Sequence, residues 1–534
     1  MRLFRAAPGA AEERVWEAVL ATGEAVAPAG RPSLSAARLR SLLTESRVDG
    51  RPGPRWVRLT GFRIDGPLDL DSSEALRPLT LTDCAVGPIS LVDGKARSLR
   101  LDRCDVAAID LSTARIEGSL HVLNSTVDGR LTLRQATVSG TVNLGGTTIM
   151  GADGVALVGD RLTVGHSFFL RGGFVARQAV RLLGARVGGQ LACDGAQFRG
   201  ADVVLDLDAA AIGGNLSLQR GRRHGAQAGP FEAAGEVCLT GAKVDGSVLC
   251  DGLLSNPDQV ALRGDNLAVR GNLVLAAGLE VTGTVRIAGA EITRNLECRA
   301  AALQDLNLTR TVVKGSLVFA PAAITGTAEL TGVTAARLLD DIERWPADRE
   351  LTGLRYDTIG AHRGPEPSVG HRVAWLPARY QPQPYEQLAA FYRGQGRDED
   401  ARRVAIARQR HRRREQPWWR RPPGYVLDAT VGYGHRPGLA LVWLAALLIL
   451  GSLLFTAFHH GGAVLAKGGA GPTPAFNPPL FTLDLLLPVV NLRQRDNWVV
   501  VGTAAQYVSA VYVVLGWIIA TAVVAALSGL LKKN

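Results

Sequence analysis

Six cysteines and nine histidines are the side chains that could carry redox or metal chemistry in this sequence. None of the cysteines forms a C-x-x-C pair, which argues against a zinc module or a disulfide framework. Cys193, Cys250 and Cys298 fall where other copies of an internal repeat carry Leu or Val, and there Cys behaves as a small buried apolar residue. A catalytic thiol would need a base and an electropositive, partly exposed setting. We therefore predict a structural role for these thiols, with a metal or redox role as the alternative.

The other polar residues form no catalytic pattern. His459 and His460 lie just past a long apolar run, with no carboxylate nearby in sequence, so we interpret them as polar residues at a membrane interface rather than a metal site. Acidic residues of the repeats, such as Asp102 and Asp128, fall mostly at outward positions. The chain contains no G-x-G-x-x-G, G-x-x-x-x-G-K-[ST], G-x-S-x-G or H-E-x-x-H signature. The residues thus give no support to the nucleotide-binding, hydrolase or zinc-protease classes.

One segment spells a known filter sequence. Residues 430–434 read TVGYG, the signature of potassium-channel selectivity filters. A filter must follow a pore helix between two spans, whereas an arginine-rich stretch precedes this segment, and residues 480–497 contain no glycine. We interpret the match as coincidental and place Tyr433 at the lipid headgroups, beside Trp418 and Trp419.

An internal repeat provides the framework for these residues. In the segment 114–144 the pattern A-x-I-x-G-x-L-x-V recurs with variations, and Gly118, Gly129 and Gly140 are eleven residues apart. Apolar residues occupy every second position, which indicates strands with one buried face. A repeat of such units predicts a parallel β-solenoid, in which each coil buries its inner face by stacking on the next coil.

The length of one coil follows from a second alignment. Segments 79–91 and 99–111 align residue by residue at a spacing of 20, which we take as one full coil. Later units are up to about 25 residues apart, so the corner loops must vary in length, with the longest insertion near 219–236. We predict a mainly β fold, a parallel β-helix (solenoid) of roughly a dozen coils over residues 51–335.

Helical segments are expected at both ends of the solenoid. Residues 11–22 and 33–46 show helical spacing, and we predict a helical N-terminal cap over residues 1–50, because the open end of a solenoid is a row of unpaired strand edges. The repeat fades after residue 335. Residues 336–384 are therefore expected to close the last coil and to form a linker.

The N-terminus and the composition indicate a cytoplasmic solenoid. Glu12 and Glu13 fall where a signal peptide would need an apolar run, so we expect no cleaved export signal. The thiols would then remain reduced. The chain is basic, with 60 Lys and Arg against 49 Asp and Glu, and its 61 glycines suit the corners of a solenoid.

A basic helical hairpin is predicted as an adaptor over residues 385–421, with a break at residues 394–396. Its arginines and tryptophans are interpreted first as the cytoplasmic anchor of the span that follows. Binding to anionic lipid headgroups, worth about 1 kcal/mol for each basic residue near the surface, and a nucleic-acid arm are the alternatives. The anchoring residues expected here are Arg412, Arg413, Arg414, Trp418, Trp419, Arg420 and Arg421.

Two apolar stretches are long enough to cross a bilayer, residues 439–458 and 507–531. Basic residues precede the first and follow the second as Lys532 and Lys533, so both termini are expected in the cytoplasm. The loop 459–506 between the spans would be non-cytoplasmic.

Two features of the membrane region suggest further packing. The apolar segment 480–490 is too short and too proline-bounded to span, and we expect it to lie in the interface or to enter the membrane as a re-entrant piece. Ala522, Ala526 and Gly529 put small residues on one helix face, where the first span or a second copy of the chain could approach closely.

The C-terminal motifs resemble a known group of proteins. The segments QPYEQLAAFYRGQGRDEDARRV, LDATVGYGHRP, FTLDLLLPVVNLRQRDNW and GWIIATAVVAALSGLLKK are similar to those of repeat-containing integral membrane proteins of high-GC Gram-positive bacteria, commonly labelled "membrane-associated oxidoreductase". The resemblance implies a pentapeptide-like or solenoid N-terminal half, a two-span C-terminus and, by its label, oxidoreductase activity. No dinucleotide fingerprint, flavin motif or paired-cysteine site accompanies that label here.

These patterns together predict a non-enzymatic scaffold at the plasma membrane, whose solenoid presents a long regular surface to a protein partner or to a second copy. The alternatives are the oxidoreductase that the resemblance implies and a two-span channel-like element with the solenoid as its sensor. We predict no catalytic, cofactor-binding or metal-ligating residue and no cofactor. The expected partners are the lipid bilayer, a protein and anionic headgroups, with nucleic acid the least favoured.

Overall fold

A computed structural model shows two compact units, Met1–Ala378 and Arg379–Asn534. The residues described are 8–28, 30–223, 226–227, 229–418, 425, 428, 438–468, 475–487 and 490–531.

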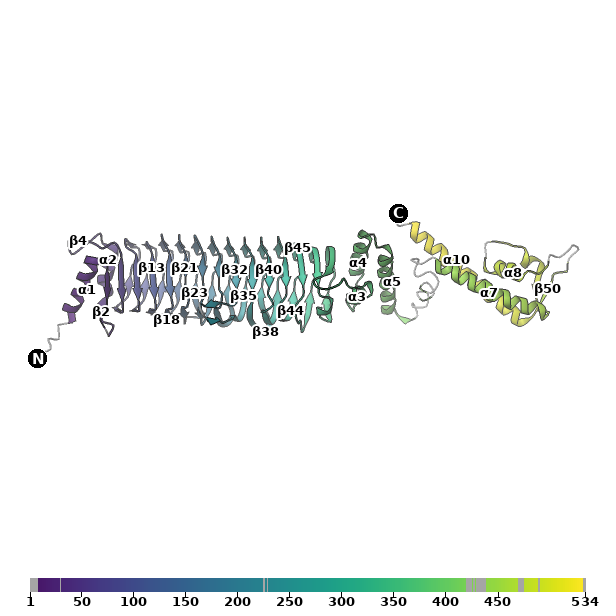
Figure 1. Cartoon of the computed structure of the whole chain (residues 1–534), viewed down its shortest axis with the longest axis horizontal. Helices are drawn as coiled ribbons and strands as arrows, with labels where there is room; N and C mark the ends of the chain where they lie inside the picture. Colours follow the sequence, from purple (N-terminus) through teal and green to yellow (C-terminus); the bar gives the residue numbers. More distant parts are fainter. Residues whose placement is uncertain are drawn as a thin grey trace. The chain divides into compact units, whose positions relative to one another are not determined.

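The first unit is a parallel β-solenoid of about 14 turns, which confirms the predicted fold class (Figure 1). A coil contains four short strands, such as β9 (Leu79–Thr82), β10 (Ala85–Val86), β11 (Ile89–Ser90) and β12 (Lys95–Ala96). The first and last of these belong to a 25-stranded sheet, and the middle two to a 20-stranded sheet. Each strand pairs in parallel with its equivalents in the coils before and after it.

The eleven-residue spacing of the glycines corresponds to half a coil. Strand β16 (Arg115–Ile116) pairs with β20 (Thr137–Val138) in the larger sheet, and β18 (Thr126–Val127) pairs with β22 (Thr148–Ile149) in the other sheet. Both registers join residues 22 positions apart, so successive eleven-residue units alternate between the two sheets.

Coil length varies along the stack. It ranges from 20 residues, where Lys95 pairs with Arg115, to 35 residues, where Gln197 pairs with Glu232. The longest coil contains the insertion expected near 219–236. Some strands of this half of the solenoid are long, notably β30 (Gln197–Asp206) and β38 (Gly252–Arg263).

Apolar side chains at alternating strand positions fill the interior. Three phenylalanines stack through consecutive coils, with ring centroids 5.9 Å apart for Phe174 and Phe198 and 5.6 Å apart for Phe198 and Phe231. The backbones of adjacent coils also approach closely at a corner. A Cβ atom added to Gly140 would lie 2.6 Å from the carbonyl oxygen of Gly118, so glycine is required there.

The N-terminal cap contributes strands as well as helices. Helix α1 (Pro8–Thr22) leads into β1 (Glu24–Val26), which pairs with β5 (Val57–Thr60), and the solenoid ladder therefore begins before the predicted start at residue 51. Strand β2 (Ser33–Ser35) pairs with β6 (Arg63–Asp65). The helix expected over 33–46 is consequently shorter, because its first residues join a sheet.

Helix α2 (Ala36–Thr44) is fixed to the solenoid by a buried arginine. The guanidinium of Arg77 donates to the carbonyl oxygens of Leu42, Glu45 and Pro54. These include carbonyl groups at the C-terminal end of α2 that have no partner within the helix. Burial lowers the pKa of Arg77.

The solenoid also extends beyond residue 335. Strands β47 (Thr334–Asp340), β48 (Asp348–Glu350) and β49 (Arg355–Ala361) continue the two sheets. An aromatic cluster closes the end, where Trp345 stacks on Phe319 at 3.8 Å between ring centroids. Helix α3 (Val369–Trp375) follows, and its Trp375 ring contacts Trp345 edge-on.

The second unit begins with the expected helical hairpin. Helix α4 (Pro382–Gly394) packs on α5 (Asp398–Glu415), and Leu388 and Val404 are fully buried in it. The turn lies at the predicted break.

Two helices of this unit are long and apolar enough to cross a bilayer, α7 (Gly438–His460) and α10 (Thr503–Leu531). Between them lie a two-stranded ribbon, β50 (Val464–Ala466) with β51 (Trp498–Val500), and the short helices α8 (Pro478–Leu486) and α9 (Gln494–Asn497). Helix α8 packs against both long helices. Phe455, Phe481 and Tyr512 form the centre of that contact.

Candidate functional site

One corner of the solenoid repeats the same turn in successive coils. After each strand pair of the 20-stranded sheet, the chain turns through a residue in the left-handed region, as at Arg161, Asn266 and Arg310, with φ of 58°, 56° and 58°. Stacking of the coils places such turns in a row along one edge. The side chains of this row and of the strand ends beside it face outward.

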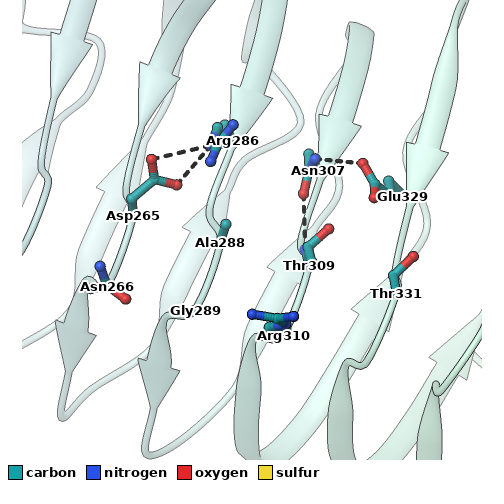
Figure 2. Close-up of a pocket in the computed structure, with 10 residues that line it drawn as sticks. All are labelled: Asp265, Asn266, Arg286, Ala288, Gly289, Asn307, Thr309, Arg310, Glu329 and Thr331. Carbon is teal, nitrogen blue, oxygen red and sulfur yellow. Dashed lines mark hydrogen bonds and ion pairs between the residues drawn. The ribbon is translucent and has the colours of Figure 1, made fainter.

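A concavity of about 510 Å³ interrupts this edge (Figure 2). It arises because Ala288 and Gly289 carry little or no side chain, whereas neighbouring coils have larger polar residues at the same positions. Ala288 is the equivalent of Asp265 and Thr309, and Gly289 is the equivalent of Asn266 and Arg310. The lining comprises Asp265, Asn266, Arg286, Ala288, Gly289, Asn307, Thr309, Arg310, Glu329 and Thr331.

Most of the polar groups in the wall are paired with one another. Both carboxylate oxygens of Asp265 accept from Nε of Arg286, at 2.9 and 3.1 Å. The Asn307 amide donates to Glu329 at 2.6 Å, and its oxygen accepts from the backbone N–H of Thr309. These contacts hold the wall in one arrangement.

Arg310 differs from the other charged residues of the concavity. It is exposed, and within the described part of the chain no acidic group pairs with its guanidinium. In Figure 2 its side chain lies at the rim, beside Gly289. A guanidinium recognises a carboxylate through two parallel hydrogen bonds. Among the described residues that line the concavity, Arg310 therefore suits recognition of an acidic group.

The cysteines of the inner row are buried, at the inward position that the repeat predicts. The register places Cys193, Cys250 and Cys298 in the same inward row as Leu218 and Leu275, and all three are buried. Burial raises the pKa of Cys250 and of Cys298 to about 12 and raises that of Cys193 as well. Among the described residues no cluster of His, Cys, Asp and Glu could hold a metal ion.

Three of the predicted anchoring residues, Arg412, Arg413 and Arg414, lie in the last turn of α5. Arg413 pairs with Asp428 at 3.3 Å and stacks over the ring of Tyr425 at 3.9 Å, while Arg412 and Arg414 are exposed on α5. Trp418 is also exposed. Outside the described residues lie Trp419, Arg420, Arg421, Lys532, Lys533 and the TVGYG segment.

Two further expectations concern the membrane region. Ala522, Ala526 and Gly529 belong to α10, but their side chains lie outside the described set. His459 sits in an aromatic cluster, 4.5 Å from Phe476 and 5.2 Å from Trp498 between ring centroids.

Three features of the structure were not apparent from sequence reasoning. Ala288 and Gly289 fit the repeat pattern and gave no signal, since a hollow depends on the neighbouring coils. The ion pair of Asp340 and Arg372 joins residues 32 positions apart. Asp484, inside an apolar segment, was the one residue whose type alone marked it as unusual.

Comparison with known proteins identifies no relative: no family model, no curated protein and no solved structure matches this chain.

Proposed function

We propose that this protein is a scaffold, anchored in the plasma membrane by α7 and α10, whose cytoplasmic solenoid binds a protein partner. Its function would rest on recognition and placement rather than on catalysis. The observation that carries the proposal is the concavity around Arg310, a preformed polar hollow on an otherwise regular surface.

The membrane part of the proposal rests on exposed apolar area. Leu441, Ile449 and Leu453 on α7 are each about two-thirds exposed, and α10 similarly exposes Val511 and Val514. In water these two faces would form a large contiguous apolar patch, which soluble monomers rarely carry. A bilayer covers such faces, and the basic residues before α7 and after α10 favour cytoplasmic termini.

The partner proposed for the concavity is a protein segment with an acidic side chain. Arg286 is already neutralised by Asp265, so Arg310 is the cation that remains to receive a carboxylate. The alanine and glycine floor leaves room for that side chain to approach. A rigid wall, held by its own hydrogen bonds, reduces the entropy lost on binding.

The test is affinity purification of the full-length protein from detergent-solubilised native membranes, with mass spectrometry of the eluate. Arg310→Glu should abolish capture of the partner. The matched control is Arg161→Glu, which changes the same residue type at an equivalent left-handed corner position outside the concavity. Equal capture of the partner by the wild type, Arg310→Glu and Arg161→Glu would contradict the proposal. A flavin or haem absorbance spectrum at one cofactor per chain would also contradict it.

A further inference from the structure

With α7 and α10 as the proposed spans, helix α8, which packs against both, lies within the membrane layer. Helix α8 descends between α7 and α10. Thr482 of α8 packs closely on Gly451 of α7, because a Cβ atom added to Gly451 would lie 2.3 Å from the Thr482 methyl group. On the other side, a Cβ atom added to Gly516 of α10 would lie 2.4 Å from the carbonyl oxygen of Leu486. At a helical rise of about 1.5 Å per residue, Gly451 lies nine residues, or about 14 Å along the helix axis, from the end of α7. Gly516 lies thirteen residues, or about 20 Å, from the start of α10.

The return limb, residues 490–496, is fixed at this depth by Asp484. This carboxylate is buried and accepts hydrogen bonds from the backbone N–H groups of Leu492 and Arg495, at 3.0 and 2.9 Å. The Arg495 guanidinium donates in turn to the carbonyl oxygen of Asp484 at 3.2 Å. The limb therefore lies beside the C-terminal half of α8, and its charged side chains Arg493, Arg495 and Asp496 lie at the same depth.

The outer surface of this limb is polar. Asn491, Arg493, Arg495 and Asp496 are all exposed, and the guanidinium of Arg493 meets no acceptor within the described part of the chain. Irregular backbone and charged side chains at membrane depth are tolerated only against protein or water, because hydrocarbon cannot replace their hydrogen bonds. Lipid cannot be the neighbour of this face.

We infer that the return limb packs against the same limb of a second copy of this chain within the membrane. The exposed face carries two arginines and Asp496, whose Oδ2 accepts from the Asn491 amide of its own chain at 3.0 Å. A two-fold arrangement can therefore place Arg493 of one copy against the other carboxylate oxygen of Asp496 in the second copy. Such an interface is self-complementary, as two-fold interfaces are. The inference rests on the proposed membrane anchoring, and it goes further by naming a self-association surface separate from the solenoid.

The test is oxidative cross-linking of the full-length protein in native membranes. Asn491→Cys, in a Cys238→Ser background, should give a band at twice the 56.6 kDa of the chain. Ile449→Cys in the same background is the control, because this residue is exposed on α7 close to Gly451 and should stay monomeric. The other five native cysteines are buried and should not interfere.

A charge exchange tests the pairing itself. Arg493→Asp should reduce the cross-linked fraction of Asn491→Cys, and adding Asp496→Arg should restore it. A single-chain mass for the unmodified protein in lipid nanodiscs would overturn the inference. So would rapid labelling of Asn491→Cys by a membrane-impermeant maleimide without cross-linking, because the limb would then face water. Failure of membrane anchoring is recognised separately, because Lys467→Cys in the loop between the spans would then not react with the membrane-impermeant maleimide in intact cells.

Discussion

Asp340 and Arg372 form an ion pair that is fully buried at the C-terminal end of the solenoid. Both carboxylate oxygens lie within hydrogen-bonding distance of Nη1, at 2.7 and 2.8 Å, and both side chains are 0% exposed. The indole N–H of Trp345 donates to the same carboxylate at 2.9 Å. The pair thus ties α3 to the last turns of the ladder, where the row of strands would otherwise end unprotected.

Arg372→Met should destabilise this end of the solenoid by about 3–5 kcal/mol, since it leaves the Asp340 carboxylate buried without an opposite charge. Hydrogen–deuterium exchange of the strands β47–β49 measures the loss. The double variant Asp340→Asn with Arg372→Met should recover most of it, because no charge remains and Trp345 keeps an acceptor. Equal exchange in wild type and Arg372→Met would contradict this account of the closure.

Gly140→Ala should destabilise the solenoid by about 1–3 kcal/mol, because the new methyl group would press on the Gly118 carbonyl of the preceding coil. Gly264→Ala is the control: its nearest neighbour would be 3.4 Å away, and its φ lies outside the left-handed region. Thermal unfolding followed by circular dichroism compares the two. A Gly140→Ala protein as stable as wild type would show that coil spacing adjusts at this corner.

The thiols should differ in reactivity in a way that burial dictates. At pH 8, a pKa of about 12 leaves about one Cys250 or Cys298 side chain in ten thousand as the reactive thiolate. Cys238, on the outer face of β35 (Phe231–Cys238), is only partly buried and should react first with iodoacetamide. Peptide mass spectrometry of the native and the urea-unfolded protein locates each adduct. Early alkylation of Cys298 in the native protein would be inconsistent with its inward position.

The sequence predicted the solenoid because its determinants are local and periodic. Alternation at positions such as Leu79 and Leu81 marks the inward row, and the repeat of Cys84 at Cys104 marks the coil length. The predicted coil of about 20 residues agrees with the eleven-residue unit being half a coil, but sequence alone does not reveal that Ile116 and Val127 belong to different sheets.

The ends of the solenoid and the concavity depend on relationships the repeat does not contain. Ser33–Ser35 has the composition of a helix start, yet it pairs with Arg63–Asp65 once a coil is present to receive it. The hollow at Ala288 exists only because adjacent coils carry longer side chains at the same positions. Such features arise from contacts between adjacent coils, whereas the periodicity of the sequence describes the strands within one coil.

The central claim is that two spans hold a protein-binding solenoid on the cytoplasmic face of the plasma membrane. It is tested most directly by thiol labelling in intact cells, with the full-length protein in a Cys238→Ser background. Lys467→Cys, in the loop between the spans, should react with a membrane-impermeant maleimide in intact cells. Asp153→Cys, on an exposed corner of the solenoid, should react only after permeabilisation. Labelling of Asp153→Cys in intact cells, or of neither cysteine until permeabilisation, would contradict the claim.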